Sequence, residues 1–426
     1  MAAAVVVAAL AVAVSTATGA PGRAAADSIT VWLQVDARSG WADAVEAANR
    51  AFKAQHPGAD VKIEYQEWTT HLTKLDASIA GGNAPDVIEM GNTEMTKYMA
   101  AGAFADLTSQ KASFPNSSTW LKGLEASATY NGKLYGVPYY AGSRAVIYRK
   151  DYFKKAGITT LPTTLDQFVS SGQKLMKTYG KNKNFSAFYF AGRDWYSGLG
   201  FVYAYGGKIA KTKGGRWVGS LDSSEAIQGL TKLKQVVLSL SRASRTTDES
   251  HPFPTVPFAQ GRSASFIGPG WQWGYALDEK AGNPKLAPQM AAFPLPGRKA
   301  GEYVPGFLGG SDLAVPVTSK NKQLAADWIK AFTATPQMTT IVKAGNIPNS
   351  TNAALLNVAK TNPKLAPFAE SAKFSWFVPQ SKNWVNVESS NVLQNMLTSI
   401  FTNRKTVKQA AVDASRQITQ ILNEST

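Results

Sequence analysis

Hydrophobic and polar positions in the first quarter of the chain follow two different periods. Short apolar or alternating runs over 29–33, 61–65 and 86–90 predict three β-strands. Between them, apolar side chains recur every three or four positions over 41–55 and 72–79, which is the spacing of one helix face. Strands and helices in this alternation predict an α/β arrangement, with a parallel sheet that carries helices on its faces.

The rest of the chain has a different texture. Over 139–310, long helical patterns alternate with aromatic, Gly-rich and Pro-rich segments, which predicts a second lobe. A strand over 312–316, an amphipathic helix over 324–332 and a largely helical stretch over 387–422 follow. A chain of 426 residues also exceeds what one hydrophobic core usually serves, so two lobes are expected.

Aromatic side chains are the unusual part of the composition. The chain has 11 Trp, 15 Tyr and 19 Phe, whereas its charged fraction of 17% lies below the roughly 25% of typical soluble domains. The net charge of +16 comes from Lys and Arg spread along the chain, not from a basic block or a nucleic-acid module. We therefore expect a solvated basic surface and no nucleic-acid partner.

The residue types that carry redox and metal chemistry are scarce. There is no Cys, which excludes disulfides, thiol catalysis and thiolate metal sites. The three His residues, His56, His71 and His251, do not have the spacing of a zinc motif. The sequence therefore predicts no metal site and no cofactor.

The N-terminal segment has the layout of an export signal. An apolar run over 2–14 is followed by small and turn-forming residues and by Ala24-Ala25-Ala26, a cleavage site of the A-x-A type. The run is too short to span a membrane. We expect a signal peptide over 1–26 and a mature chain from Asp27. No Lys or Arg precedes the run, and a disordered apolar tail is the alternative interpretation.

Five segments, taken in order, resemble the extracellular solute-binding proteins of carbohydrate ATP-binding-cassette (ABC) importers, the family that includes maltose-binding protein. The overall sequence is most similar to the actinobacterial branch that handles chitin-derived disaccharides. The resemblance covers nearly all of the mature chain. The segments are GGNAPDVI over 81–88, GKLYGVP over 132–138, AVIYRKD over 145–151, GPGW over 268–271, and GGS over 309–311 leading to SKNK over 319–322.

The resemblance implies a periplasmic-binding-protein-like fold of type II. Two α/β lobes would enclose a ligand cleft, with several hinge crossings between them. Lobe 1 would take 27–138 and 312–362, and lobe 2 would take 139–311 and 363–426.

The same resemblance implies a monomeric receptor and not an enzyme. It would act at the cell surface and deliver an oligosaccharide, such as N,N'-diacetylchitobiose, to the membrane permease subunits of an ABC importer. Family members are commonly anchored through a lipid on a Cys after the signal, and this sequence contains no Cys.

Aromatic rings are the first candidates for contact with a sugar. A pyranose has apolar C–H faces and a rim of hydroxyl groups, so it is bound by flat rings together with fixed polar partners. Trp271 and Trp273 follow the tight turn at Gly268-Pro269-Gly270, which projects them. By resemblance, Trp271 matches the stacking tryptophan of the family and Trp384 matches its C-terminal stacking ring. A tryptophan that only covers a lobe core is the alternative.

Polar candidates lie where the three predicted strands end. Ligands of parallel sheets collect beyond the carboxyl ends of the strands, which here lead into 34–38, 66–68 and 91–94. Glu94 also begins a predicted helix, where a carboxylate is favourable for helix stability alone. The side chains proposed to contact ligand in these segments are Asp36, Arg38, Asn92, Thr93 and Glu94.

The second lobe and the crossings supply the remaining candidates. By resemblance, Asp194-Trp195-Tyr196 matches an acid-then-aromatic stretch of the family, although Asp194 is equally suited to an N-cap or Asx turn. Arg144 at the first crossing has a fork of donors for hydroxyl groups, or for a bridge between lobes. Gly310 and Ser311 lie at the return crossing, where Gly allows close ligand approach or hinge freedom.

Two other functions are compatible with these features. A secreted glycoside hydrolase would share the signal, the rings and the cleft, but it needs two carboxylates about 5 to 10 Å apart. No local motif proposes such a pair, and we predict no catalytic residues. A receptor for a non-sugar ligand such as a peptide is also compatible with the composition.

Overall fold

Strand and helix alternate at the start of the chain as the pattern predicts. The computed structural model describes residues 28–424. β1 pairs in parallel with both β2 and β3, and Val31 of β1 lies opposite Ile63 and Val87. The elements are β1 (Ser28–Gln34), α2 (Ala42–Gln55), β2 (Asp60–Gln66), α3 (His71–Ala80) and β3 (Val87–Gly91).

Three later strands complete this sheet. β6 (Gly136–Gly142), β13 (Gly309–Ala314) and β14 (Ile347–Pro348) join it in the order β14-β6-β13-β3-β1-β2. β13 runs antiparallel to both of its neighbours. The strand predicted over 312–316 is β13, which begins earlier because Gly309 already pairs with Gly142 of β6.

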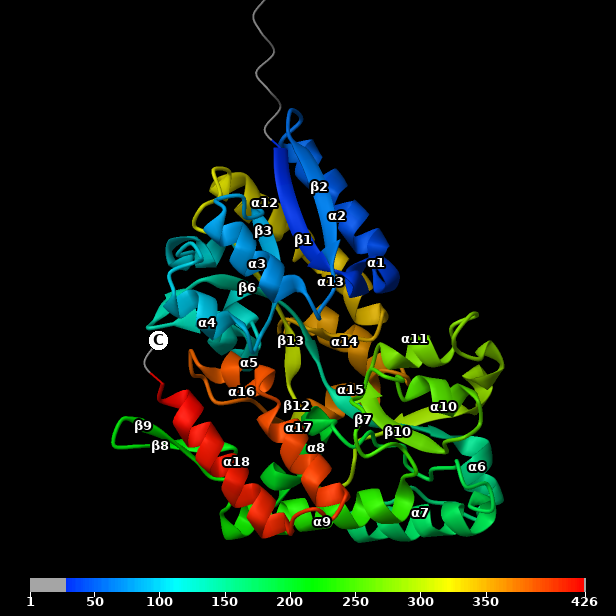
Figure 1. The fold of residues 1–426 in the computed structure, drawn as a ribbon. Helices are drawn as coiled ribbons and strands as arrows, with labels where there is room; N and C mark the ends of the chain where they lie inside the picture. The colour runs from blue at the N-terminus through cyan, green and yellow to red at the C-terminus, as the bar shows by residue number, and fades with distance from the viewer. Residues whose placement is uncertain (1–27, 425–426) are drawn as a thin grey trace, which may run out of the picture.

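Helices cover both faces of the six-stranded sheet, as Figure 1 shows for its upper part. On one face α2, α12 (Lys322–Phe332) and α13 (Thr335–Lys343) enclose a core that contains Phe52 and Trp328. On the other face α3 and α4 (Met95–Ala100) enclose Leu75 and Met95. Alternate residues of each strand supply the two cores, as a pleated sheet requires. These elements form the first lobe.

A second, smaller sheet organises the lower part of Figure 1. Its strands are β10 (Ser265–Pro269), β7 (Arg144–Arg149) and β11 (Met290–Phe293), with β7 in the centre and both pairings antiparallel. α7 (Leu165–Tyr179), α8 (Trp195–Ala204) and α9 (Ser224–Leu240) pack around a ring-rich core that includes Phe168 and Phe188. This is the second lobe, and the two together form the two-lobed α/β fold that was expected.

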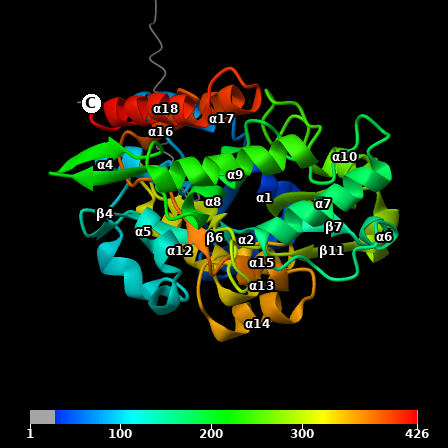
Figure 2. The ribbon, with the colours of Figure 1, turned by 90° about the horizontal axis from the view of Figure 1, so that it is seen from below.

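The C-terminal part is helical, in line with the prediction for 387–422, and Figure 2 shows α17 and α18 along one side of the molecule near α9. α16 (Trp384–Ser389), α17 (Val392–Phe401) and α18 (Val407–Leu422) contribute to the ring-rich core of the second lobe. Thr406 caps α18 and forms a capping box with Gln409, which fixes where this helix begins.

Short elements connect these units. They are α1 (Val35–Gly40), α5 (Lys122–Ser127), α6 (Lys150–Lys155), α10 (Thr255–Ala259), α11 (Gln272–Ala276), α14 (Ala353–Thr361), α15 (Ala366–Ser371), β4 (Thr129–Tyr130), β5 (Lys133–Leu134), β8 (Ala210–Lys213), β9 (Arg216–Gly219), β12 (Gly306–Phe307), β15 (Ser375–Trp376) and 3-10 helices over 108–113, 117–119 and 284–289.

The chain passes between the lobes three times: twice at neighbouring points, described next, and once more between β14 of the first sheet and β15, which pairs with β12. β6 ends in the first sheet at Gly142, and β7 begins in the second sheet at Arg144. On the return, β12 pairs with β15 and β13 enters the first sheet at Gly309. The lobe boundaries given above stay a prediction.

The predicted signal segment over 1–26 lies outside the described residues. Among the helices of residues 28–424, none combines the length and the apolar character needed to cross a membrane.

Candidate functional site

Arg144 lies at the crossing from the first lobe to the second. It is the first residue of β7 and pairs with Pro269 of β10. Its guanidinium carbon is 5.2 Å from the centre of the Tyr196 ring and 5.7 Å from that of Phe307. Contact with the two aromatic rings stabilises the cation and uses none of its N–H groups as hydrogen-bond donors.

A cavity of about 440 Å³ lies on one side of this crossing, and both lobes line it. We call it the aromatic end. The Trp271 ring lies directly against β6, because a methyl group at Gly142 would come within 2.9 Å of it. The lining residues are Asp36, Ser39, Gly40, Trp41, Gly270, Trp271, Trp273, Gly274, Tyr275, Asp278, Lys343, Ala344, Gly345, Asn362, Lys364 and Leu365.

Asp36 joins the two lobes at the aromatic end. Its Oδ2 accepts a hydrogen bond of 2.6 Å from the Trp68 indole, and its Oδ1 accepts one of 3.2 Å from the Tyr275 hydroxyl. Burial, followed by the charge of Asp36, raises the pKa of Tyr275 to about 12, so the phenol stays a donor. The Asp36 carboxylate still has acceptor capacity for a ligand.

A second cavity of about 210 Å³ lies on the Tyr196 side of Arg144. We call it the acidic end. The Tyr196 ring lines this cavity and stacks on Trp195 with ring centres 4.0 Å apart. The lining residues are Arg193, Trp195, Tyr196, Asp248, Glu249, Ser250, Glu388, Asn391 and Gln394.

Burial governs the carboxyl groups of the acidic end. It raises the pKa of Asp194 and of Glu249, and in each case the Arg144 charge opposes the rise. Burial also raises the pKa of Glu388 to about 8, against the hydrogen bond from the Trp384 indole. These carboxyls are therefore protonated more readily than ordinary ones, and a protonated carboxyl offers a donor as well as an acceptor.

The first lobe faces the acidic end through the residues after β3. The Asn92 amide donates to the Leu308 carbonyl over 3.0 Å, so this donor is already used within the protein. Glu94 Oε2 lies 2.9 Å from His71 Nε2 and accepts a bond of 2.8 Å from the Gly91 N–H. Burial lowers the pKa of His71, but the hydrogen bond and charge of Glu94 outweigh it and raise that pKa overall. Thr93 lies near Glu388 across the cleft and slightly opposes the rise in the pKa of that carboxyl.

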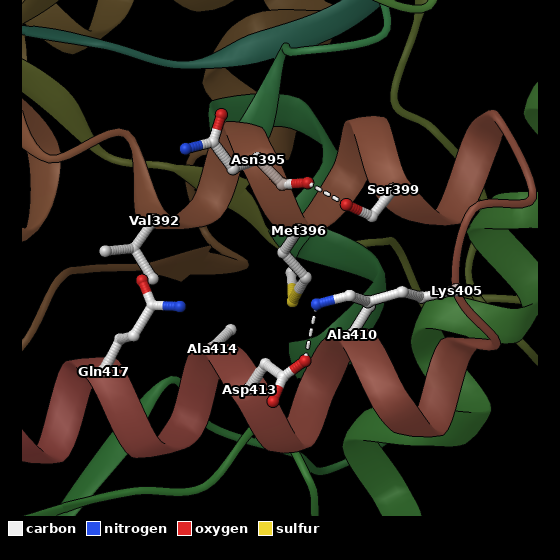
Figure 3. Close-up of a pocket in the computed structure, with 9 residues that line it drawn as sticks. All are labelled: Val392, Asn395, Met396, Ser399, Lys405, Ala410, Asp413, Ala414 and Gln417. Atoms are coloured by element: carbon white, nitrogen blue, oxygen red, sulfur yellow. Dashed lines mark hydrogen bonds and ion pairs between the residues drawn. The ribbon is translucent and has the colours of Figure 1, made fainter.

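Two further cavities lie outside the cleft, one of about 550 Å³ beside β1 and α3 and the other between α17 and α18 (Figure 3). The paired polar groups described next belong to the cavity between α17 and α18. Its volume is about 90 Å³. Lys405 and Asp413 form an ion pair of 2.6 Å at its edge, and the Ser399 hydroxyl donates to the Asn395 carbonyl. Its small size and internally paired polar groups are those of a packing gap between helices.

Comparison with known proteins identifies the family. The family model described as bacterial extracellular solute-binding protein matches residues 47–367, which is most of the chain. The diacetylchitobiose binding protein DasA of Streptomyces coelicolor is 32% identical over 399 residues, covering 92% of this chain and 88% of that protein. The chain belongs to the bacterial extracellular solute-binding proteins. These are exported receptors and not enzymes, so the hydrolase alternative is set aside.

Solved structures of other solute-binding proteins share the fold. The GacH receptor of Streptomyces glaucescens has a TM-score of 0.80 at 21% identity, and the alignment covers 94% of this chain and all of that one (100%). The sugar-binding protein MalE of Xanthomonas citri has a TM-score of 0.77 at 17% identity, with 93% and 97% covered. At these identities the likeness establishes the type II periplasmic-binding-protein fold alone.

The candidates named from the sequence of this solute-binding protein fall into two groups. Those that line the cavities or lie at the crossing beside them are Asp36, Arg144, Trp195, Tyr196, Trp271 and Trp273. Asp194 lies just behind the acidic end, where its Oδ1 accepts a 3.0 Å bond from the Ser197 N–H and caps α8. The N-cap role that the sequence left open for Asp194 is therefore present.

Other candidates lie away from the cavities. The expectation of a stacking ring at Trp384 needs correction, because this side chain is only 1% exposed inside the second-lobe core and donates to Glu388. Arg38 is exposed and lies over the Tyr65 ring at 5.5 Å. Ser311 is fully buried beside Glu89. Gly310 has φ 148°, and a Cβ there would lie 2.2 Å from the Tyr140 carbonyl, so packing alone requires glycine.

Sequence reasoning missed four side chains of the site. Trp68 is 38% exposed and follows β2, within the segment 66–68 where ligands were expected. Its place after a strand end could therefore have identified it as a candidate. Tyr275 lies four residues after Trp271, on the same side of a short helix. Glu249 and Glu388 are far apart in sequence, and no local pattern marks either of them.

Proposed function

We propose that this chain binds a short oligosaccharide between its lobes and delivers it, unaltered, to the permease subunits of an ABC importer. The observation that carries the proposal is the aromatic end, a cavity to which both lobes contribute. Trp271 offers a ring face to a pyranose, and Asp36 offers carboxylate oxygens to its hydroxyl groups. A sugar in this position contacts both lobes at once.

Lobe closure follows from this arrangement. A ligand held by one lobe gains its second set of contacts only when the lobes approach, so it shifts the open–closed equilibrium by its difference in affinity for the two states. The Tyr275 to Asp36 hydrogen bond is one contact that such closure would form and opening would break. The closed form is then the state that the permease subunits recognise.

The printed ligands of similar proteins narrow the choice of sugar. DasA of Streptomyces coelicolor is described as binding diacetylchitobiose, and the GacH receptor was solved with acarbose. We propose N,N'-diacetylchitobiose or a related disaccharide as the ligand. The aromatic end, with about 440 Å³, has the volume of a typical small-molecule site.

Titration calorimetry with N,N'-diacetylchitobiose, cellobiose, maltose and xylobiose tests the proposal. At least one of these sugars should bind with a dissociation constant near 1 μM, roughly −8 kcal/mol. The same sugar should raise the melting temperature with increasing concentration, because it binds only the folded state. Binding of peptides with no sugar bound would contradict the proposal, as would saccharide products detected by mass spectrometry after incubation.

A further inference from the structure

Trp68 is the one tryptophan that the structure leaves in solvent. All 11 Trp of the chain lie within residues 28–424, and only Trp68 is exposed, at 38%. Its indole N–H is used in the 2.6 Å hydrogen bond to Asp36, so the side chain presents mainly ring carbon to solvent. The ring meets that of His71 edge to face with centres 5.2 Å apart, and a Cβ at Gly91 would lie 3.5 Å from it. Trp68 is therefore a fixed apolar surface at the strand ends of the first lobe.

A second exposed ring lies on the opposite lobe. Phe253 is 40% exposed, and its ring meets that of Tyr275 edge to face with centres 5.9 Å apart. The contact partners of the two exposed rings, Asp36 and Tyr275, both line the aromatic end and hydrogen-bond each other. Trp68 and Phe253 are thus one contact away from the cavity lining and open to solvent. We call these two residues the rim of the aromatic end.

The rim follows the cleft. On the second lobe, Phe253 comes directly after the residues 248–250, which line the acidic end, and it packs at the aromatic end. On the first lobe, Trp68 lies between Asp36, in the aromatic end, and Gly91, the last residue of β3. A ligand that extends out of the aromatic end along the cleft therefore passes these ring surfaces.

We propose that Trp68 and Phe253 form an outer subsite, which binds the third unit of an oligosaccharide whose first two units occupy the aromatic end. This inference rests on the proposed function and names the class of ligand within it, chains of three or more units. A pyranose has apolar C–H faces, and these bury exposed ring carbon by stacking on it. Because the two rings belong to different lobes, the third unit also adds contacts that only the closed form offers.

The chain contains a matched control for the rim. Phe374 is 37% exposed and meets the Tyr303 ring edge to face with centres 5.3 Å apart, much as Phe253 meets Tyr275. Neither Phe374 nor Tyr303 lines either cavity of the cleft. Phe253→Ala and Phe374→Ala therefore remove the same exposed ring, one at the rim and one outside it.

Titration calorimetry on the full chain tests the inference with the four disaccharides named above and with triacetylchitotriose, cellotriose, maltotriose and xylotriose. The readout is the ratio of trisaccharide to disaccharide affinity, because damage to the shared aromatic end weakens both sugars alike. Wild type should bind its preferred trisaccharide about tenfold more tightly than the matching disaccharide. Trp68→Ala and Phe253→Ala should each lower this ratio about threefold or more, whereas Phe374→Ala should leave it unchanged.

Separate outcomes decide the outer subsite and the function on which it rests. A wild-type chain that binds none of the eight sugars would end the proposed function. Equal affinity for disaccharide and trisaccharide would overturn only the outer subsite, as would a ratio that neither rim variant lowers or that Phe374→Ala lowers equally.

Fluorescence quenching of the wild-type chain by acrylamide gives an independent reading. The trisaccharide should reduce quenching more than the disaccharide does, because its third unit covers the indole of Trp68, the exposed tryptophan. Equal quenching with the two sugars bound would also overturn the outer subsite.

Discussion

The aromatic end and the acidic end flank the same crossing, yet they are built in opposite ways. The aromatic end takes residues from both lobes and combines ring faces with the carboxylates of Asp36 and Asp278. All residues that line the acidic end come from the second-lobe part of the chain, and burial raises the pKa values of two of its carboxyl groups, Glu249 and Glu388. When the lobes move apart, the lining of the aromatic end is divided between them, whereas the lining of the acidic end stays on one lobe and loses only its first-lobe neighbours Thr93 and Glu94.

Two tryptophans show what this difference means. The family resemblance gives Trp271 and Trp384 the same role as stacking rings. Trp271 keeps an exposed ring face in the aromatic end, whereas Trp384 is enclosed in the second-lobe core with its ring 6.1 Å from that of Trp195. Trp384 therefore affects the cleft indirectly. It donates a hydrogen bond to Glu388 and packs against Trp195, which stacks on Tyr196. Truncation of Trp384 should therefore lower stability, whereas truncation of Trp271 should weaken sugar binding.

The largest expected effect is on stability at the acidic end. Trp384→Ala removes a fully buried ring and leaves a cavity, which should lower the free energy of unfolding by about 3–5 kcal/mol. Urea unfolding followed by circular dichroism measures this loss. Trp384→Phe keeps most of the volume and should retain sugar binding within about threefold, since the ring makes no contact with ligand. If Trp384→Phe folds but no longer binds sugar, Trp384 would have to be a ring that stacks on the sugar after all.

The next effect is on binding at the aromatic end. Trp271→Ala removes the ring face offered to the sugar and should cost at least about 2 kcal/mol of binding, roughly thirtyfold in affinity. Its free energy of unfolding should change by less than about 1 kcal/mol, because the ring is only partly buried. Calorimetry and urea unfolding on the same preparation give both numbers. A large loss of stability with unchanged affinity would contradict the division between the two ends.

Gly142 provides a second way to perturb the same ring. An added methyl group would come within 2.9 Å of Trp271 and push the ring away from β6. Gly142→Ala should therefore weaken sugar binding in the same direction as Trp271→Ala but less strongly. Unchanged affinity would mean that the ring position is not important for binding.

The sequence predicted the elements of the first lobe because their periods are regular and local. Strand and helix bounds over 29–90 agree with the structure to within a few residues. Asp36 and Trp271, which line the aromatic end, could be proposed from the sequence because they follow a strand end and a Gly-Pro turn, which are local signals; their contact with a ligand stays a prediction. Glu249 and Glu388 were missed because only tertiary packing brings them together. Trp384 was misplaced because a ring that stacks on sugar and a ring that fills a core have the same sequence signature.

A smaller effect concerns the pH dependence of the acidic end. The pKa of Glu388 is raised from 4.5 to about 8, so the folded chain holds its proton over a range where the unfolded chain releases it. Stability from this group is full below pH 4.5 and is lost as the pH rises through about 8. Glu388→Gln should therefore unfold less readily than wild type at pH 8.5, with little difference at pH 4.

Urea midpoints of ligand-free protein at pH 4, 6 and 8.5 check this prediction. Gln keeps an acceptor for the Trp384 indole, so the variant removes the titration and not the hydrogen bond. Burial also raises the pKa of Glu249 and that of Asp312, the latter to about 8. These groups titrate in the same direction as Glu388, so the variant should keep part of the dependence of stability on pH. An identical pH profile for wild type and Glu388→Gln would mean that cleft water keeps Glu388 ionised at neutral pH.

The smallest effect distinguishes the two arginines that the sequence offered as ligand contacts. Arg38 is exposed, lies over Tyr65 and lines neither cavity, so Arg38→Ala should change sugar affinity by less than about twofold, or 0.4 kcal/mol. Arg144 lies between the two ends with its guanidinium over the Tyr196 ring, and Arg144→Ala should weaken binding about tenfold in the same titration. Both residues carry the same charge, so long-range electrostatics would give equal losses. Unequal losses in this order would mean that position at the crossing, and not charge alone, makes an arginine part of the site.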